Sequence, residues 1–332
     1  MENKIDLVLL WVDGSDPKWL EEKNQYSKVK VDYSSDANRF RDWDNMQYLF
    51  RGIEKFAPWV NNVFFITWGH LPKWMNPNHP KLKIINHKDY IPEAYRPTFN
   101  SNTIELNLHR IPELSENFIL FNDDMFLLKE TKPEDFFING QPRDEFCFNP
   151  ILPMGEKFRI AHTNVNNIGV VNKYFKKNVV VKKHRSKIYN LKYGKNVIRS
   201  FMLKPWNCFV GIRNPHLPIS HTKSNFDKLW ELEGEQLDAT CLNRFRGYND
   251  LNHWLMRYWN LCNGNFVPRK SSFGKYFNLS SNNKAIVDYI TNKKGSMICI
   301  NDMSTDYDFD VVKAELINAF DKILPEKSSF EK

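Results

Sequence analysis

The chain has 332 residues, of which 42% are hydrophobic and 26% charged, an ordinary globular composition with ample length for a core. It shows no basic and apolar leader and no apolar run near membrane-span length. We therefore expect a cytoplasmic protein, soluble or peripheral on the inner face of the membrane, that is not secreted. Its five cysteines lie far apart without a C-x-x-C spacing, which argues against a zinc ribbon and a disulfide framework.

The net charge of +8 is concentrated in one segment. Residues 155–204 hold thirteen Lys or Arg and one acidic residue, so this segment carries +12 and the rest of the chain −4. Such a block is expected to attract a polyanion: an anionic glycan, a phosphorylated substrate or an anionic membrane. A solvated basic surface without a partner is the alternative. No nucleic-acid partner is expected, because the sequence lacks helix-turn-helix, zinc-finger and RNP signatures.

The first predicted element is a strand over residues 5–12 that runs into a turn. The turn has the sequence D-G-S-D-P at residues 13–17, and both Asp-Gly and Asp-Pro favour turns. Ligands of open α/β sheets bind beyond the carboxyl ends of the strands. Asp13 is therefore a candidate for nucleotide contact, and Gly14 for close approach of the backbone to a ligand. A tight turn with a side-chain cap is the alternative.

Helix and strand patterns then alternate up to about residue 130. Apolar residues at helical spacing predict a helix over residues 45–56 that ends before a proline. The next predicted elements are strands over 62–67 and 81–86 and a helix over 103–111. This alternation predicts an α/β fold with a Rossmann-like parallel sheet.

The most informative stretch is F-I-L-F-N-D-D-M-F at residues 118–126. Its four apolar residues fit a buried strand, and Asn122, Asp123 and Asp124 follow at once. Adjacent carboxylates are costly there unless they are paired or hold a cation, and Mg²⁺ or Mn²⁺ on a diphosphate is the cation we expect. In a parallel sheet, this acidic end and Asp13 would share one edge. A surface turn, for which Asn-Asp-Asp is suitable, is the alternative.

The second half of the chain is mixed. The basic segment includes a β-rich run at 178–181, residues 225–263 favour helix, and a strand over 297–300 and a helix over 309–324 close the chain. The sequence contains neither G-x-x-x-x-G-K-[ST] nor G-x-G-x-x-G, which disfavours kinases, ATPases and dinucleotide dehydrogenases.

We expect one catalytic unit over residues 1–332 with three parts. A Rossmann-like part (1–150) is followed by an inserted basic, partly helical lobe (151–210). A helical part (211–332) then contributes the final strand and helix, which complete the active site.

Four blocks, read in order, resemble the four conserved regions of the Stealth family, which includes bacterial capsular polysaccharide phosphotransferases and the catalytic subunit of lysosomal-enzyme GlcNAc-1-phosphotransferase. The first block is L-W-V-D-G-S-D-P at residues 10–17. The second combines 39–42, 48–60, 71–74, 97–102, 104–105, 108–111 and 121–126. The third combines 216–218, Thr240, 244–246 and Asp250, and the fourth 300–302, 324–325 and 329–331.

The resemblance implies that the sheet is of the nucleotide-sugar transferase type, with residues 1–150 as the nucleotide-sugar part, and it also implies a reaction. A UDP-sugar, such as UDP-GlcNAc or another UDP-hexose, would donate sugar-1-phosphate to a hydroxyl of a glycan acceptor in surface polysaccharide synthesis, forming a phosphodiester and releasing UMP. One alternative is a metal-dependent glycosyltransferase that uses the same acidic strand end and releases UDP. Another, from a different class, is a non-catalytic protein that binds polyanions through the basic segment.

Residue roles are implied by the same resemblance. His216 is the general-base candidate, since imidazole titrates near neutrality, and Arg246 would stabilise charge on the transferred phosphoryl group. Asp42 and Glu105 fall on positions that look catalytic. Asp123 and Asp124 are the metal candidates, and the nucleotide-sugar contacts are assigned to Asp13, Gly14, Asn122, Asn301 and Asp302. Glu331 matches the fourth block without a chemical role.

The sequence departs from the usual family pattern at three places. Trp43 stands where asparagine is common, and Trp68-Gly69-His70 replaces the commoner Asp-Gly-Gln or Asn-Gly-Gln. A second histidine often follows the 216–218 block directly, but here it comes two residues later, as His221. These changes bear on donor and acceptor contacts and on the proton path, and not on the reaction class.

Overall fold

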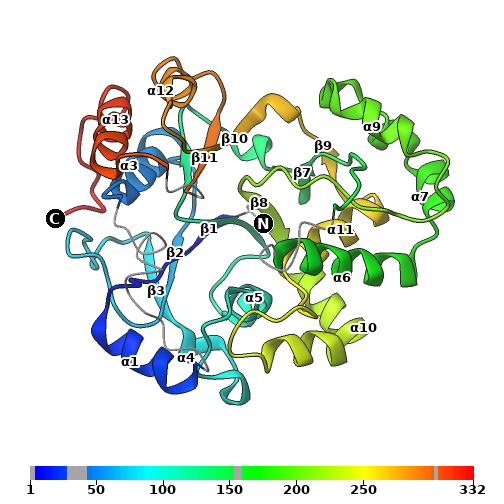
Figure 1. The fold of residues 1–332 in the computed structure, drawn as a ribbon, viewed down its shortest axis with the longest axis horizontal. Coiled ribbons are helices and arrows are strands. Elements are labelled where there is room, and N and C mark those ends of the chain that lie inside the picture. Colours follow the sequence, from blue (N-terminus) through cyan, green and yellow to red (C-terminus); the bar gives the residue numbers. More distant parts are fainter. Residues whose placement is uncertain (1–3, 28–42, 153–158, 303–305) are drawn as a thin grey trace.

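A computed structural model of the chain describes residues 4–27, 43–152, 159–302 and 306–332 (Figure 1). A five-stranded sheet forms its centre, with the strand order β3-β2-β1-β4-β8. The first four strands are parallel to one another, and β8 is antiparallel to β4. The strands are β1 (Ile5–Leu10), β2 (Val63–Thr67), β3 (Leu82–Asn86), β4 (Asn117–Phe121) and β8 (Ile219–Thr222). The predicted α/β fold with a parallel sheet is thereby confirmed.

The central strands are apolar on both faces because helices cover both faces of the sheet. In β1, Leu7 and Leu9 join one hydrophobic cluster, whereas Val8, which points the opposite way, joins the other. The first cluster includes α3 (Met46–Phe56), α12 (Lys284–Thr291) and α13 (Phe309–Asp321). The second includes α5 (Ser101–Leu106), α6 (Arg159–Tyr174), α10 (Lys223–Cys241) and α11 (Trp254–Asn263).

Two small sheets extend the core beyond the carboxyl end of β4. In the first, β11 (Met297–Asn301) pairs with β10 (Gly274–Asn278) in parallel and with β5 (Met125–Leu127) in antiparallel fashion. The second contains β6 (Phe137–Ile138), β7 (Gln141–Asp144) and β9 (Val267–Pro268). Strand β5 directly follows Asn122, Asp123 and Asp124. Its pairing with β11 therefore places residues 300–302 of the predicted fourth block beside these three residues.

The other elements are short. The α-helices are α1 (Pro17–Tyr26), α4 (His87–Tyr90), α7 (Lys177–Lys183), α8 (Arg185–Ile188) and α9 (Asn196–Met202). The 3₁₀ turns are η2 (Glu93–Tyr95), η3 (Leu108–Arg110), η4 (Pro133–Asp135), η5 (Leu191–Tyr193) and η6 (Ser271–Phe273). None of the described helices is long and apolar enough to cross a membrane, and all five cysteines are free thiols.

Two local predictions were wrong. The β-rich run at 178–181 is helical and forms α7. A helix buries Val180 and leaves Val179 exposed, and this tertiary packing outweighs the strand preference of the valines. The helix predicted over 103–111 begins at Ser101 and ends at Leu106, before the short turn η3. The three-part division of the chain stays a prediction.

Glu331 has a structural explanation. Its carboxylate accepts hydrogen bonds from Nε and Nη2 of Arg51 on α3, each at 2.9 Å, and from the backbone N–H of Ser328 at 2.8 Å. These bonds hold the end of the chain against α3, so a catalytic role is not required for this residue.

Candidate active site

The two acidic strand ends share one edge of the sheet, because β1 and β4 are parallel neighbours. Asn122, Asp123 and Asp124 form a turn between β4 and β5, closed by the hydrogen bond from Met125 N to Asn122 O at 3.2 Å. Asp123 is exposed, whereas Oδ1 of Asp124 is buried and has no hydrogen-bond partner among the described residues. The turn is therefore more than a solvated surface turn, since it holds a buried acceptor with unused capacity.

Strand β11 packs against this turn. Ile300 N donates to the backbone oxygen of Asp124 at 2.9 Å, and the Cys299 thiol donates to Asp124 Oδ2 at 3.2 Å. Loss of solvation, together with the charge of Asp123, raises the pKa of Asp124 to about 7. Cys299 was missed by the sequence reasoning, because a cysteine inside an apolar strand gives no signal of a polar contact.

His216 lies directly beside the acidic turn. Its Nε2 is 4.0 Å from Asp124 Oδ2, and its ring meets that of Tyr276 edge-on, with the centroids 5.1 Å apart. Burial lowers the pKa of His216, so the imidazole is neutral near pH 7 and can accept a proton. Its backbone φ of +52° lies in the left-handed region that few non-glycine residues adopt.

The residues at this turn fit a hard divalent cation. Ligand atoms of Asp124, His216 and Cys299 lie within 4.8 Å of one another. Mg²⁺ and Mn²⁺ prefer oxygen ligands, which Asp123 and Asp124 supply, the latter with an unpartnered oxygen. Burial raises the pKa of the Cys299 thiol, so the thiol stays protonated and orients the carboxylate instead of ligating a cation.

The predicted nucleotide-sugar residues surround the same edge. Asp13 Oδ1 accepts hydrogen bonds from the N–H and the hydroxyl of Ser15 at 2.8 and 2.6 Å. Asp302 accepts one from the Tyr307 hydroxyl and keeps its buried Oδ2 without a partner among the described residues. Asn301 ends β11 and donates to Asn278 Oδ1 at 3.1 Å.

The unusual Trp68-Gly69-His70 sequence now has a physical role. His70 Nε2 accepts the Asp13 backbone N–H at 2.7 Å, so it ties the end of β2 to the turn after β1. Gly14 is buried within that turn, while Asp16 caps α1 by accepting from the backbone N–H groups of Lys18 and Trp19. The predicted turn with a side-chain cap is therefore present, and a ligand at this edge stays a prediction.

A second polar group lies on the neighbouring helix α5. Glu105 is buried at 8% exposure, and its Oε2 is 3.8 Å from His253 Nε2. Arg246 donates to the Ser101 hydroxyl. His253 in turn contacts the buried His221, with Nδ1 and Nε2 3.1 Å apart. His221, the second histidine that follows the third block, is thus buried against His253 near Glu105 and lies outside the solvent-facing site.

The acidic turn with His216 and the buried polar group around Glu105 are neighbours. Trp254 lies between them: its ring centroid is 6.2 Å from that of His216 and 6.1 Å from that of His253. The pKa of His253 is lowered first by burial and then by the nearby His221 and His216. Asp42 lies outside the described residues, and its predicted role stays a prediction.

Glu105 provides a test of buried charge. Burial raises its pKa to about 7 from the usual 4.5, against opposing effects of Arg246, Ser101 and the His253 backbone. The ionised Glu105 carboxylate therefore destabilises the folded state. This destabilisation is complete above pH 7 and absent below pH 4.5. Glu105→Gln is expected to raise the free energy of unfolding by up to about 3 kcal/mol above neutrality, with the gain vanishing on acidification.

Urea unfolding of both proteins across this pH range would measure the difference. Glu113→Gln is the matched control, because the Glu113 side chain is 71% exposed and should show no pH-dependent gain. A Glu105→Gln variant that is less stable than the native chain at every pH would contradict the prediction.

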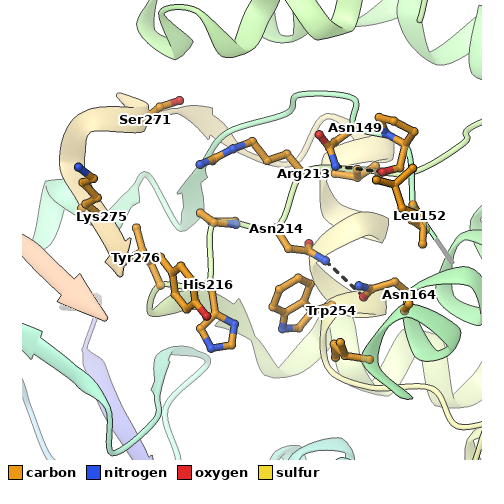
Figure 2. Close-up of a pocket in the computed structure, with 18 of the residues that line it drawn as sticks. Asn149, Leu152, Asn164, Arg213, Asn214, His216, Trp254, Ser271, Lys275 and Tyr276 are labelled. Carbon is orange, nitrogen blue, oxygen red and sulfur yellow. Dashed lines mark hydrogen bonds between the residues drawn. The ribbon is translucent and has the colours of Figure 1, made fainter. Parts of the chain in front are cut away.

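A cavity of about 760 Å³ has His216 in its wall. Figure 2 shows its lining, in which His216, Tyr276 and Lys275 lie on one side and Asn214, Trp254 and Asn164 on the other. His216 therefore belongs both to the cavity wall and to the acidic turn. Aromatic rings among hydrogen-bonding and basic side chains are suited to a sugar with anionic groups.

Arg257 holds the loop that carries His216 in place. Its guanidinium pairs with the Asp144 carboxylate at 2.6 and 2.9 Å, and it also donates to Arg213 O and Asn214 Oδ1 at 2.9 and 3.1 Å. Arg257 and Asp144 are both buried. This arrangement positions the cavity wall immediately before His216.

Arg257→Met is expected to lower the free energy of unfolding by about 3–5 kcal/mol, because it leaves the Asp144 carboxylate buried without its partner. Guanidinium chloride unfolding would measure the loss. The exposed Arg185 offers the matched control Arg185→Met, for which little change is expected. Equal stability of the two variants would show that the ion pair does not hold the loop.

Comparison with known proteins decides the family. Models of the Stealth protein conserved regions 1 and 2 match residues 3–28 and 39–144. A capsular polysaccharide phosphotransferase WcwK of Streptococcus pneumoniae is 43% identical over 332 residues, covering 99% of this chain and 98% of its own. The chain belongs to the Stealth family.

A second relative and a solved structure match over a similar length of this chain. The exopolysaccharide phosphotransferase cps2G of Lactiplantibacillus plantarum is 42% identical over 99% of this chain and 96% of its own. Among solved structures, the WbbM bifunctional glycosyltransferase matches 96% of this chain and 50% of its own, with 9% identity and a TM-score of 0.38. The matched Stealth regions include Asp13, Glu105, Asp123 and Asp124.

Proposed function

We propose that this protein transfers sugar-1-phosphate from a UDP-sugar to a hydroxyl of a polysaccharide acceptor, in the synthesis of a capsule or another surface polysaccharide. The support comes first from full-length relatives that are named capsular and exopolysaccharide phosphotransferases. The single structural observation that carries the proposal is the position of His216, which lines a large cavity and lies 4.0 Å from the Asp124 carboxylate of the acidic turn. This position suits a base at the junction of the cavity and the acidic turn, where a hydroxyl of an acceptor in the cavity could meet the phosphorus of a diphosphate held at the turn.

The proposed reaction conserves every atom. An acceptor oxygen in the cavity forms a bond to the phosphorus that carries the sugar, while the bond from that phosphorus to the bridging oxygen breaks. UMP leaves with the bridging oxygen and its electron pair. His216 Nε2 takes the proton of the acceptor hydroxyl, which its lowered pKa permits near neutral pH.

The remaining site residues bind and orient the donor. Asp123 and Asp124 would hold Mg²⁺ or Mn²⁺, and the ion would supply positive charge to the diphosphate oxygens. Asp13 with Gly14, Asn122, and Asn301 with Asp302 would contact the nucleotide sugar from three strand ends. Arg246 would stabilise the transferred phosphoryl group, for which its exposed guanidinium and its place beside Glu105 are suitable.

Glycosyl transfer from the same site would break the bond between the sugar carbon and oxygen and release UDP. Chromatography of the nucleotide products, after incubation with a panel of UDP-sugars, Mg²⁺ or Mn²⁺ and a capsule-derived acceptor, separates the two reactions. UMP that increases with the acceptor is the expected result and identifies the donor sugar. Release of UDP would overturn the proposal in favour of glycosyl transfer.

Chelation of the metal by EDTA should abolish turnover, and added Mg²⁺ or Mn²⁺ should restore it.

A further inference from the structure

The basic part of the chain also concentrates exposed apolar side chains. Of the fifteen large hydrophobic residues that are exposed in the described structure, ten lie within residues 152–206. The most exposed of them is Leu191, at 90%. Soluble monomers rarely gather such residues on one part of their surface unless the surface has a partner.

These side chains form a surface around α9 and η5, which we call the docking face. Its apolar members are Leu191, Ile198, Phe201, Met202 and Trp206, and its basic members are Lys192, Lys195 and Lys204, all of them exposed. Figure 1 places α9 and α7 at the end of the molecule opposite α13.

Local contacts hold the docking face in place. Ile198, Phe201 and Met202 follow the i, i+3, i+4 spacing that puts side chains on one face of a helix. The Phe201 ring stacks on Tyr189 with centroids 4.4 Å apart. Lys177 Nζ donates to the backbone oxygens of Leu203 and Trp206 at 2.5 and 2.6 Å. The apolar side chains are thus presented by an anchored helix.

The segment that carries the docking face has charge of one sign. The sequence contains no Asp or Glu between residues 157 and 226, so no acidic side chain of this segment neutralises its lysines. Basic residues around exposed apolar side chains are typical of proteins that lie on an anionic membrane, where lysines meet lipid headgroups and apolar groups enter the acyl boundary.

We propose that the docking face binds the surface of an anionic lipid bilayer. An anionic polysaccharide would also attract the lysines, but it offers no apolar phase for Leu191, Phe201 or Met202. The combination of charge and exposed apolar side chains therefore favours lipid over glycan.

Helix α9, which carries part of the docking face, also contacts a residue of the cavity wall beside His216. Arg199 of α9 donates to Asn149 Oδ1, and Phe148 N donates to Ser200 Oγ at 3.0 Å. Asn149 and Leu152 line the cavity, and Leu152 is 66% exposed. Docking would therefore bring the cavity close to the membrane, where an acceptor carried on a lipid could enter it. This consequence for the acceptor rests on the proposed function, whereas docking itself does not.

Co-sedimentation of the full chain with vesicles tests the proposal without any substrate. Binding is expected to vesicles of phosphatidylcholine with phosphatidylglycerol, to be weak with phosphatidylcholine alone, and to fall as salt is added. Lys192→Gln with Lys195→Gln should weaken binding roughly thirtyfold, since each basic residue near an anionic surface contributes about 1 kcal/mol. Leu191→Ser with Met202→Ser should weaken it about tenfold or more.

Matched controls lie outside the docking face, on α12, on α13 and at the end of α10. Lys284→Gln with Lys322→Gln removes the same charge from α12 and the end of α13, and Val311→Ser with Leu242→Ser removes apolar side chains that are 56% and 53% exposed. The charge control should lower affinity much less than the docking-face lysine pair, and the apolar control should leave binding almost unchanged.

Three outcomes would overturn the proposal. They are equal losses in the control and docking-face variants, binding to soluble anionic polysaccharide but not to vesicles, and self-association that buries the docking face in sedimentation equilibrium. If nucleotide turnover with a soluble acceptor persists in a variant that no longer binds vesicles, docking and catalysis are separate properties. Vesicle binding by a chain that releases no UMP would instead refute the proposed function alone.

Discussion

His216→Asn is expected to lower turnover by about a hundredfold to ten-thousandfold, the range that general-base catalysis contributes. The variant removes the only atom that we assign to proton transfer, Nε2, which lies 4.0 Å from Asp124 Oδ2. Asparagine is the informative substitution because it tolerates a positive φ, and His216 has a φ of +52°. The loss would therefore report chemistry and not backbone strain. UMP release under saturating donor and acceptor measures it.

The control for this variant is another histidine of the same chain. His162 is exposed on α6, where it meets Tyr248 edge-on, and it is absent from the cavity lining. His162→Asn should retain full turnover. Thermal unfolding should show both variants folded. Turnover of His216→Asn near the native rate would remove this residue from the mechanism, whatever the product proved to be.

Asp124→Asn is expected to reduce turnover by about a thousandfold or more, because a metal on the diphosphate supplies several kcal/mol of charge stabilisation. The same change should weaken Mn²⁺ binding in isothermal titration calorimetry. It should not destabilise the fold: burial and the charge of Asp123 make the carboxylate unfavourable and raise its pKa to about 7, a cost that the neutral amide avoids. A lost activity with an equal or higher melting temperature would separate function from folding.

Asp310→Asn provides the matched comparison, since Asp310 is exposed in the first turn of α13 and should affect neither turnover nor Mn²⁺ binding. The stricter test combines Asp123→Ala with Asp124→Ala. Full activity in that double variant would exclude the acidic turn as the metal site, even if UMP remained the product. Weakened metal binding with unchanged turnover would mean that the cation is not needed for the reaction.

Much of the site could be predicted because strand signals are local. Apolar runs followed by polar turns marked β1 and β4, and their parallel pairing places Asp13 and Asp124 at one edge, as any parallel sheet requires. The strands over 62–67, 81–86 and 297–300 were also predicted to within one residue of β2, β3 and β11. Where the prediction was wrong, at α7, three consecutive valines gave a strand pattern, but packing of a helix with Val180 buried outweighed it.

The sequence by itself determined the fold class, the family resemblance and the identity of most candidate residues, because these depend on composition, periodicity and order along the chain. Only the tertiary structure decided which of them meet. The antiparallel pairing of β11 with β5 brings Cys299 to Asp124 across 175 positions of sequence, and Arg257 fixes the loop of His216 through a buried carboxylate. Such contacts depend on packing between distant segments, which no local pattern records. The same reason explains the docking face: the sequence showed its charge, but burial alone separates the apolar side chains that face solvent from those in the core.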